Sequence, residues 1–153
     1  MIKYEKAMFT FTEVPDELSL CINCTCCPLK CKGCFEPWLR DDYGKELTND
    51  EIDLLLSDCP WVTCICFMGG VNDYIALYHL MEYVKSRGYK VAIYSGHPHM
   101  QPGIMDLADY YKVGPYMPEY GPLNSKTTNQ RFWKKENNCQ WTDITYRFQE
   151  ERV

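Results

Sequence analysis

The chain has 153 residues, 46% apolar and 24% charged, with a formal net charge of −5, which fits a single domain over 1–153 with its own hydrophobic core. No apolar run reaches the roughly 18 residues of a membrane span, and the first residues lack a secretory-signal pattern, so we expect a cytoplasmic protein without a membrane partner. Net negative charge argues against a nucleic-acid partner, whose phosphates need clustered Lys and Arg.

The first half of the chain is predicted to alternate strands and helices. Residues 18–24 alternate apolar and small polar side chains, which predicts a strand, and a cysteine-rich loop over 21–35 begins within it. A capping pattern that starts at Thr48 predicts a short helix, with an apolar face through residues 52–56. The apolar, β-branched run 62–68 predicts a buried parallel strand.

The second half continues this alternation. Asn72 is placed to cap a long helix over 73–87, and Gly88 is a suitable residue to end it. The remaining predicted elements are a strand at 90–94, a short helix at 104–109, a strand at 110–113 and, within a loop-rich segment over 115–153, a terminal strand at 142–148.

These elements predict an α/β fold. Strands that alternate with helices indicate βα units and a mostly parallel sheet, and this length allows a partial (βα) barrel but no complete eight-unit barrel. Ligands of parallel α/β sheets bind at the carboxyl ends of the strands. We therefore expect the cysteine loop, Gly69-Gly70 and Ser95-Gly96 to meet at one edge of the sheet.

Six of the ten cysteines lie between Cys21 and Cys34. A disulfide-rich secreted protein would spread its cysteines over the chain, so this clustering favours a metal site in a reducing compartment. Two CxxC pairs would suit zinc, but the spacer between them is short for a zinc ribbon. A ferredoxin-type electron carrier is also possible, because Cys21, Cys24, Cys27 and Cys31 match C-x2-C-x2-C-x3-C, although Lys32 replaces the usual proline.

A third register is Cys27-x3-Cys31-x2-Cys34. Three thiolates can hold three irons of a [4Fe–4S] cluster and leave the fourth iron open, as catalytic metal sites leave one position open. An open iron can bind the amino and carboxylate groups of S-adenosylmethionine. This register therefore predicts a catalytic cluster, whereas the other two predict a structural or electron-carrying site.

The third register, at the end of a first strand, resembles that of the radical S-adenosylmethionine superfamily. The run Cys31-Lys32-Gly33-Cys34-Phe35 resembles the CxGC-aromatic ending found in activating enzymes of glycyl-radical proteins. The run Phe67-Met68-Gly69-Gly70 resembles the Gly-Gly segment that holds the methionine moiety, and Tyr94-Ser95-Gly96 resembles the aromatic-x-Gly end of a later strand. Residues 112–116 and 124–132 resemble the C-terminal part of the activating components of anaerobic ribonucleotide reductases.

The resemblance covers about residues 21–131 and implies an oxidoreductase with a short, single-domain core. A reduced cluster would cleave S-adenosylmethionine to methionine and a 5′-deoxyadenosyl radical, which takes a hydrogen atom from a glycine of the anaerobic ribonucleoside-triphosphate reductase. Flavodoxin or a ferredoxin would supply the electron. Another glycyl-radical protein as the target and a non-catalytic electron carrier remain alternatives.

The resemblance also implies site residues. The cluster ligands would be Cys27, Cys31 and Cys34, with no further catalytic residue. The S-adenosylmethionine contacts would be Phe35, Gly69, Gly70, Asn72, Asp73 and Ser95. The superfamily usually carries an acidic residue directly after Gly-Gly, whereas this chain has Val71. We expect Cys21, Cys59, Cys64 and Cys66 to pack in the core.

Overall fold

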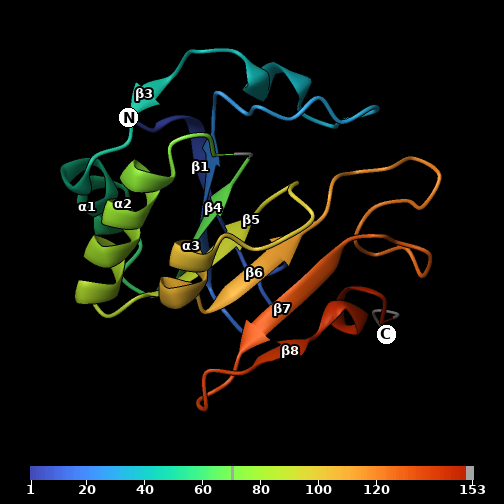
Figure 1. Cartoon of the computed structure of the whole chain (residues 1–153). Coiled ribbons are helices and arrows are strands. Elements are labelled where there is room, and N and C mark those ends of the chain that lie inside the picture. The colour runs from blue at the N-terminus through green and yellow to red at the C-terminus, as the bar shows by residue number, and fades with distance from the viewer. Residues whose placement is uncertain (70, 151–153) are drawn as a thin grey trace.

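The computed structural model describes residues 1–69 and 71–150, which fold around an eight-stranded sheet (Figure 1). The strand order is β3-β1-β2-β4-β5-β6-β7-β8. In that order the strands are Lys45–Glu46, Lys3–Thr10, Ser19–Cys24, Cys64–Met68, Lys90–Tyr94, Tyr110–Val113, Arg131–Lys135 and Trp141–Asp143. Hydrogen bonds do not close this sheet into a barrel.

The α/β class is confirmed, but the sheet is mixed rather than mostly parallel. Its four central strands, β2, β4, β5 and β6, run parallel. The strands at both sides are antiparallel: β1 pairs with β2 and β3, and β7 pairs with β6 and β8. The connections from β1 to β2 and from β7 to β8 are too short for the crossover that parallel pairing needs.

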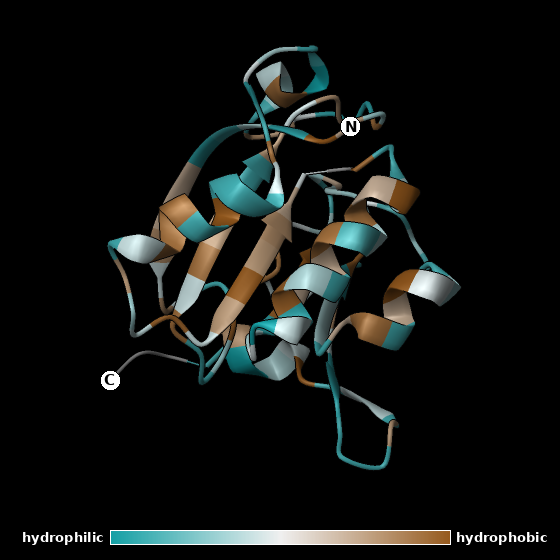
Figure 2. Cartoon of the chain, turned by 90° about the vertical axis from the view of Figure 1, so that its left-hand side faces the viewer, coloured by the Kyte–Doolittle hydropathy of each residue, from teal (hydrophilic) through white to brown (hydrophobic). Residues whose placement is uncertain are grey.

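Three α-helices cover one face of the sheet (Figure 1). They are α1 (Asn49–Ser57), α2 (Tyr74–Ser86) and α3 (Pro102–Leu107), and two short 3-10 helices, η1 (Pro37–Arg40) and η2 (Thr145–Phe148), lie in the connections. Figure 2 shows apolar residues along the central strands that these helices cover. Among the described residues, every helix is too short or too polar to cross a bilayer.

Helix capping agrees with the sequence at one helix and differs at another. The Thr48 side chain accepts a hydrogen bond from the Glu51 N–H at the start of α1, as predicted. At α2, Asp73 rather than Asn72 is the cap, and its carboxylate accepts from the Ala76 N–H at 3.0 Å. A carboxylate at this position also interacts favourably with the positive end of the helix dipole.

Two other predicted elements have different boundaries. The short helix begins at Pro102 instead of 104, because proline fits the first turn, where its missing N–H costs nothing. The terminal strand ends at Asp143 instead of 148. The Asp143 carboxylate accepts from the Thr145 N–H at 2.9 Å, which turns the chain out of the ladder and into η2.

The sheet separates two apolar clusters. The larger cluster lies under the helices and includes Cys24 and Cys59. The smaller cluster lies on the other face and includes Cys21, Cys64 and Cys66. All five thiols are buried, so the expectation that Cys21, Cys59, Cys64 and Cys66 pack in the core is confirmed.

Candidate functional site

The four parallel strands end at one edge of the sheet, and a cavity of about 250 Å³ lies there. Segments that follow β2, β4, β5 and β6 line it, as the strand-end rule expects. Its lining includes six of the predicted site residues: Cys27, Cys31, Cys34, Phe35, Gly69 and Ser95. The predicted convergence of the cysteine loop with Gly69 and with Ser95-Gly96 is therefore confirmed, while Gly70 lies outside the described residues.

Hydrogen bonds fix the cysteine loop beside η1. The Cys27 N–H donates to the Leu39 carbonyl at 2.9 Å. The Arg40 guanidinium donates to the Cys31 carbonyl, also at 2.9 Å. Because Leu39 is buried and Arg40 follows it in η1, these hydrogen bonds hold both cysteines against the body of the domain.

A tight turn brings the second and third cysteines of the motif together. The Cys34 N–H donates to the Cys31 carbonyl at 3.3 Å, and Gly33 within this turn has a φ of +73°. Glycine adopts this left-handed conformation without strain. A Cβ at Gly33 would also lie 3.4 Å from the Tyr116 ring, and that ring packs on Phe35 with a centroid distance of 5.0 Å. The loop after β6 therefore covers the turn.

Two glycines allow the loops to approach each other closely. Gly69 has a φ of +92°, and a Cβ there would lie 2.5 Å from the Cys24 carbonyl oxygen. At Gly96 a Cβ would lie 2.4 Å from Cδ1 of Leu29 and 3.9 Å from Sγ of Cys31. A side chain at Gly69 would collide with the backbone of Cys24, whereas at Gly96 the end of the flexible Leu29 side chain could move aside, so Gly69 is the stricter requirement.

The lining of the cavity includes two basic residues, Arg40 and Lys112. The sequence motifs did not identify either of them as a site residue. Lys112 lies on β6, is almost completely buried, and donates to the Gly114 carbonyl at 2.9 Å. Burial lowers the pKa of Lys112 to about 8, although the nearby Cys31 thiol acts in the opposite direction. A lysine inside the otherwise apolar strand Tyr110–Val113 is the signal that could have found this residue.

Glu36 supplies the acidic group in the described lining of the cavity. The side-chain amide of buried Asn23 donates to both Glu36 carboxylate oxygens, at 3.1 and 3.3 Å. The Lys6 ammonium lies 3.4 Å from the same carboxylate. These contacts hold the Glu36 carboxyl group at the cavity, whereas the residue after Gly69-Gly70 is Val71, which has no acidic group.

The two remaining predicted contact residues do not line this cavity. Asn72 is exposed, and Asp73 is used as the cap of α2. The zinc and ferredoxin-type patterns both need Cys21 and Cys24 as ligands. These two side chains are 1% exposed and are buried on opposite faces of the sheet, one in each apolar cluster. Burial raises the pKa of the Cys24 thiol to about 12, which disfavours the thiolate that a metal would need.

Within 1–69 and 71–150, no set of three or more His, Cys, Asp or Glu side chains is arranged to hold a single metal ion. The three cysteines of the third register instead line the walls of one cavity, together with two glycines, two cations and a carboxylate. Thiolates are the usual ligands of iron–sulfur clusters.

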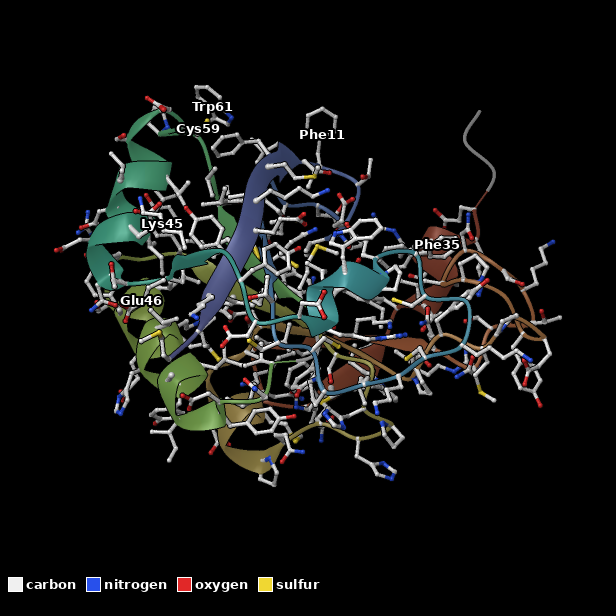
Figure 3. The ribbon with its side chains drawn as sticks, turned by 90° about the horizontal axis from the view of Figure 1, so that it is seen from above. Phe11, Phe35, Lys45, Glu46, Cys59 and Trp61 are labelled. Atoms are coloured by element: carbon white, nitrogen blue, oxygen red, sulfur yellow. The ribbon has the colours of Figure 1, made fainter. Side chains whose placement is uncertain are left out.

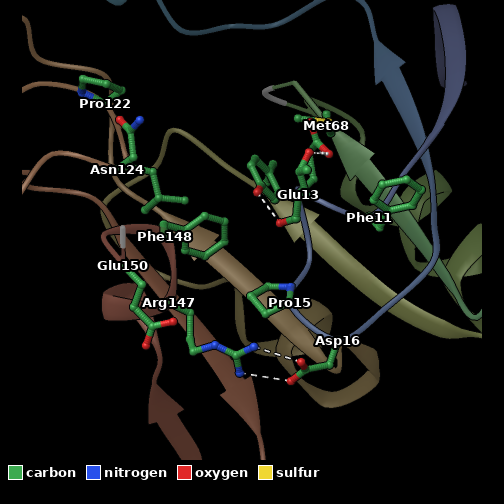
Figure 4. A pocket seen from close by; sticks show the side chains of 13 residues that line it. Phe11, Glu13, Pro15, Asp16, Met68, Pro122, Asn124, Arg147, Phe148 and Glu150 are labelled. Atoms are coloured by element: carbon green, nitrogen blue, oxygen red, sulfur yellow. Dashed lines mark hydrogen bonds and ion pairs between the residues drawn. The ribbon is translucent and has the colours of Figure 1, made fainter. Parts of the chain in front are cut away.

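A second, larger cavity of about 930 Å³ shares two wall residues with the first, Met68 and Tyr94. It lies between residues 11–16, which connect β1 to β2, and the C-terminal segments 122–124 and 147–150 (Figure 4). The two cavities therefore meet at the ends of β4 and β5.

No family model, no curated protein and no solved structure matches this chain.

Proposed function

We propose that this protein is an iron–sulfur activating enzyme that cleaves S-adenosylmethionine reductively and generates a glycyl radical on a partner protein, the anaerobic ribonucleoside-triphosphate reductase. The observation that carries this proposal is the shared cavity of Cys27, Cys31 and Cys34, which also contains Gly69 and Ser95. These residues belong to three separate motifs, and Cys27 and Ser95 are 68 positions apart in the sequence. A cluster with a bound S-adenosylmethionine would contact all three motifs, which gives a reason for them to lie together.

The chemistry of the three cysteines supports a [4Fe–4S] cluster as the bound group. The three cysteines are partly exposed to the cavity, whereas the other cysteines of the motif region are either buried in the core, as Cys21 and Cys24 are, or tied to Asp42, as Cys26 is. A cluster held by three thiolates would supply one electron to the sulfonium of a bound S-adenosylmethionine and so produce methionine and a 5′-deoxyadenosyl radical.

The charged residues of the cavity have distinct roles in this proposal. Lys112 and Arg40 balance the negative charge that three thiolates bring to a partly buried site. The Glu36 carboxylate, oriented by Asn23, faces a ligand's ammonium group and replaces the acidic residue that is absent after Gly69-Gly70. The Gly69 backbone allows the ligand to approach β4 closely.

The remaining lining is partly apolar. Leu29, Phe35 and Tyr116 cover the cavity from the cysteine loop and from the loop after β6. Excluding water strengthens the electrostatic contacts inside a site and protects reactive species. In this proposal the open, mixed sheet is the partial (βα) barrel of a short radical S-adenosylmethionine core, and flavodoxin or a ferredoxin is the electron donor.

The proposal is tested by anaerobic loading with iron and sulfide, reduction with dithionite, and measurement of 5′-deoxyadenosine after addition of S-adenosylmethionine. We expect 5′-deoxyadenosine from the wild-type protein and none from Cys34→Ala. The matched control is Cys26→Ala, which removes a partly exposed thiol from the same loop. A fully loaded and reduced wild-type protein that forms no 5′-deoxyadenosine contradicts the proposal and favours an electron carrier.

The partner is tested in the same reaction. Addition of purified anaerobic ribonucleoside-triphosphate reductase should produce a glycyl-radical signal in electron paramagnetic resonance. Formation of 5′-deoxyadenosine without that signal would keep the radical chemistry and change the target to another glycyl-radical protein.

A further inference from the structure

Lys112 places a buried positive charge in the wall of the smaller cavity. It lies on β6 and is 9% exposed. Among the described residues, its ammonium group has one hydrogen-bond acceptor, the Gly114 carbonyl at 2.9 Å. An ammonium group carries three N–H donors, so two of them remain for a further acceptor.

This charge differs from other partly buried lysines of the sheet and its helices. Lys85 on α2 forms an ion pair with Asp109 at 2.8 Å. Lys90 on β5 forms an ion pair with Glu17. Within 1–69 and 71–150, no carboxylate forms such a pair with Lys112. Because buried charges are normally paired, the charge of Lys112 favours an anionic group inside the cavity.

The other charged residues of the cavity do not provide this counter-charge. The Glu36 carboxylate accepts hydrogen bonds from Asn23 and lies 3.4 Å from the Lys6 ammonium. The second cation, Arg40, is exposed, so water screens its charge more strongly than that of Lys112. Of these two cations, Lys112 therefore has the stronger electrostatic effect on a group bound in the cavity.

The lining around Lys112 is partly apolar. Leu29 and Leu39 belong to it. Phe35, which follows Cys34 in the cysteine loop beside η1 (Figure 3), packs on Tyr116 with a centroid distance of 5.0 Å. Coulomb interactions strengthen as the local dielectric constant falls. A charge at Lys112 should therefore act on a bound group over a longer range than a charge on the surface.

A cluster on the three motif cysteines would supply the missing negative charge. Cys31, one of its proposed ligands, is the ionisable neighbour whose charge interacts with the Lys112 ammonium. Three thiolates give a [4Fe–4S] cluster a net negative charge, and reduction by one electron adds another. A nearby cation stabilises the reduced state more than the oxidised state, because the reduced state is more negative.

We infer that the buried ammonium group of Lys112 raises the reduction potential of the cluster held by Cys27, Cys31 and Cys34. This inference rests on the cluster of the proposed function. The step that Lys112 affects is the transfer of one electron from an external reductant, such as dithionite, to the irons of the cluster. Net charge near the cluster is one of the properties that set the potentials of iron–sulfur proteins.

The test is a redox titration of the loaded protein without S-adenosylmethionine, in which electron paramagnetic resonance measures the reduced cluster. Lys112→Gln removes the charge but keeps an N–H group for the Gly114 carbonyl, and Lys112→Arg keeps the charge. At a fixed potential, we expect Lys112→Gln to lower the ratio of reduced to oxidised cluster at least tenfold, which corresponds to about 59 mV for one electron. Lys112→Arg should stay within about threefold of wild type, since its charge is retained.

The matched control is Lys135→Gln on β7. Lys135 is also partly buried, but its ammonium donates to the carbonyls of Met105 and Asp106 and does not line the cavity. This variant loses the same charge elsewhere in the fold and should titrate as wild type.

The uncharged variants should fold, because burial of the ammonium group opposes folding. Lys112→Met is a second uncharged variant of similar length. Circular dichroism measures the fold of each variant, and iron and sulfide analysis measures its cluster content.

Three results would overturn the inference. One is an equal potential in wild type and both uncharged variants, or an equal shift in Lys112→Gln and Lys135→Gln. Another is a difference that arises only after S-adenosylmethionine is added, because Lys112 would then act on the carboxylate of that ligand. The third is folded uncharged variants that bind no cluster, because Lys112 would then be needed for assembly.

The titration also separates the inference from the proposed function. A loaded wild-type protein that forms no 5′-deoxyadenosine contradicts the proposed function, whereas the predicted shift would still support the role of Lys112 beside an electron-carrying cluster. A wild-type protein that forms 5′-deoxyadenosine, with unchanged potentials in the variants, contradicts the inference alone. A wild-type protein that binds no cluster overturns both.

Discussion

Tyr94 and Met68, at the ends of two neighbouring parallel strands, form a wall that both cavities share. The position of Tyr94 is fixed from two sides: its ring packs edge-on against Phe132 with a centroid distance of 5.8 Å, and its hydroxyl donates to the Glu13 carbonyl. The shape of both cavities therefore depends on the positions of these two residues.

Tyr94→Phe should test this anchoring. The change keeps the ring and removes the hydrogen bond to the connection 11–16, so we expect a loss of about 0.5–1.5 kcal/mol in the free energy of unfolding. Urea denaturation measures it. Tyr146→Phe is the control, because that side chain is 57% exposed and should change stability little. Equal effects of the two substitutions would show that the Tyr94 hydroxyl does not hold the wall.

Gly69→Ala should disrupt the edge of the sheet much more than Gly88→Ala. Both glycines have positive φ, so both substitutions impose left-handed strain of about 1–2 kcal/mol. Only at Gly69 does the added Cβ meet backbone, the Cys24 carbonyl at 2.5 Å, whereas at Gly88 it meets nothing within 4 Å. We expect Gly69→Ala to lose more than about 3 kcal/mol of stability and to bind less iron after loading. Similar losses in both variants would contradict the close approach.

Lys112 should make the stability of the cluster-free protein depend on alkaline pH. Burial lowers the pKa of Lys112 to about 8, against 10.5 for an ordinary lysine. Between these values the unfolded chain binds more protons than the folded chain, so the free energy of unfolding rises with pH, by up to about 1.4 kcal/mol per pH unit. Below pH 8 both states are protonated and this contribution is constant.

The measurement compares wild type with Lys112→Met, since subtraction removes the titration of all other groups. We expect the difference in the free energy of unfolding to change in favour of wild type from about pH 8 to about pH 10. A difference that is constant over this range would mean that Lys112 is not desolvated.

Glu17 should make stability depend on acidic pH, and its contribution, like that of Lys112, should rise with pH. Burial raises the pKa of the Glu17 carboxyl, but hydrogen bonds from Lys90, Thr63 and Tyr110 outweigh it, and the net pKa is lowered. The stabilisation is therefore complete above the ordinary glutamate pKa and is lost as the pH falls through the lowered one. We expect Glu17→Gln to cost about 1–3 kcal/mol at pH 7 and less at about pH 3. Denaturation of both proteins at the two pH values measures this, with exposed Glu119→Gln as the control.

The sequence was sufficient for the central strands. Strands β5 and β6 begin and end at the predicted residues, because apolar, β-branched or aromatic runs stop at glycine-containing turns. It was insufficient for β1, whose charged residues Lys3, Glu5 and Lys6 hide the strand pattern. Pairing with β2 and the short β3 stabilises β1, and this interaction is not visible in a local pattern.

The candidate site shows the same division. The motif cysteines, Gly69 and Ser95 could be placed at one edge because parallel strands end together. Glu36 and Arg40 could not be placed there from the sequence. Their side chains reach the cavity because η1 packs beside the cysteine loop, and this packing leaves no local sequence pattern. Asn72 was expected at the site from its nearness to Gly69 in sequence, but the start of α2 leaves it exposed.

In the proposed function, Cys27, Cys31 and Cys34 hold a cluster that cleaves S-adenosylmethionine. The most direct measurement is 5′-deoxyadenosine formation by the loaded, dithionite-reduced protein and by single alanine variants of these cysteines and of Cys21. We expect product formation to be lost in the first three variants and retained in Cys21→Ala. Product formation that survives Cys34→Ala but is lost in Cys21→Ala would contradict this expectation and assign the cluster to the ferredoxin-type register.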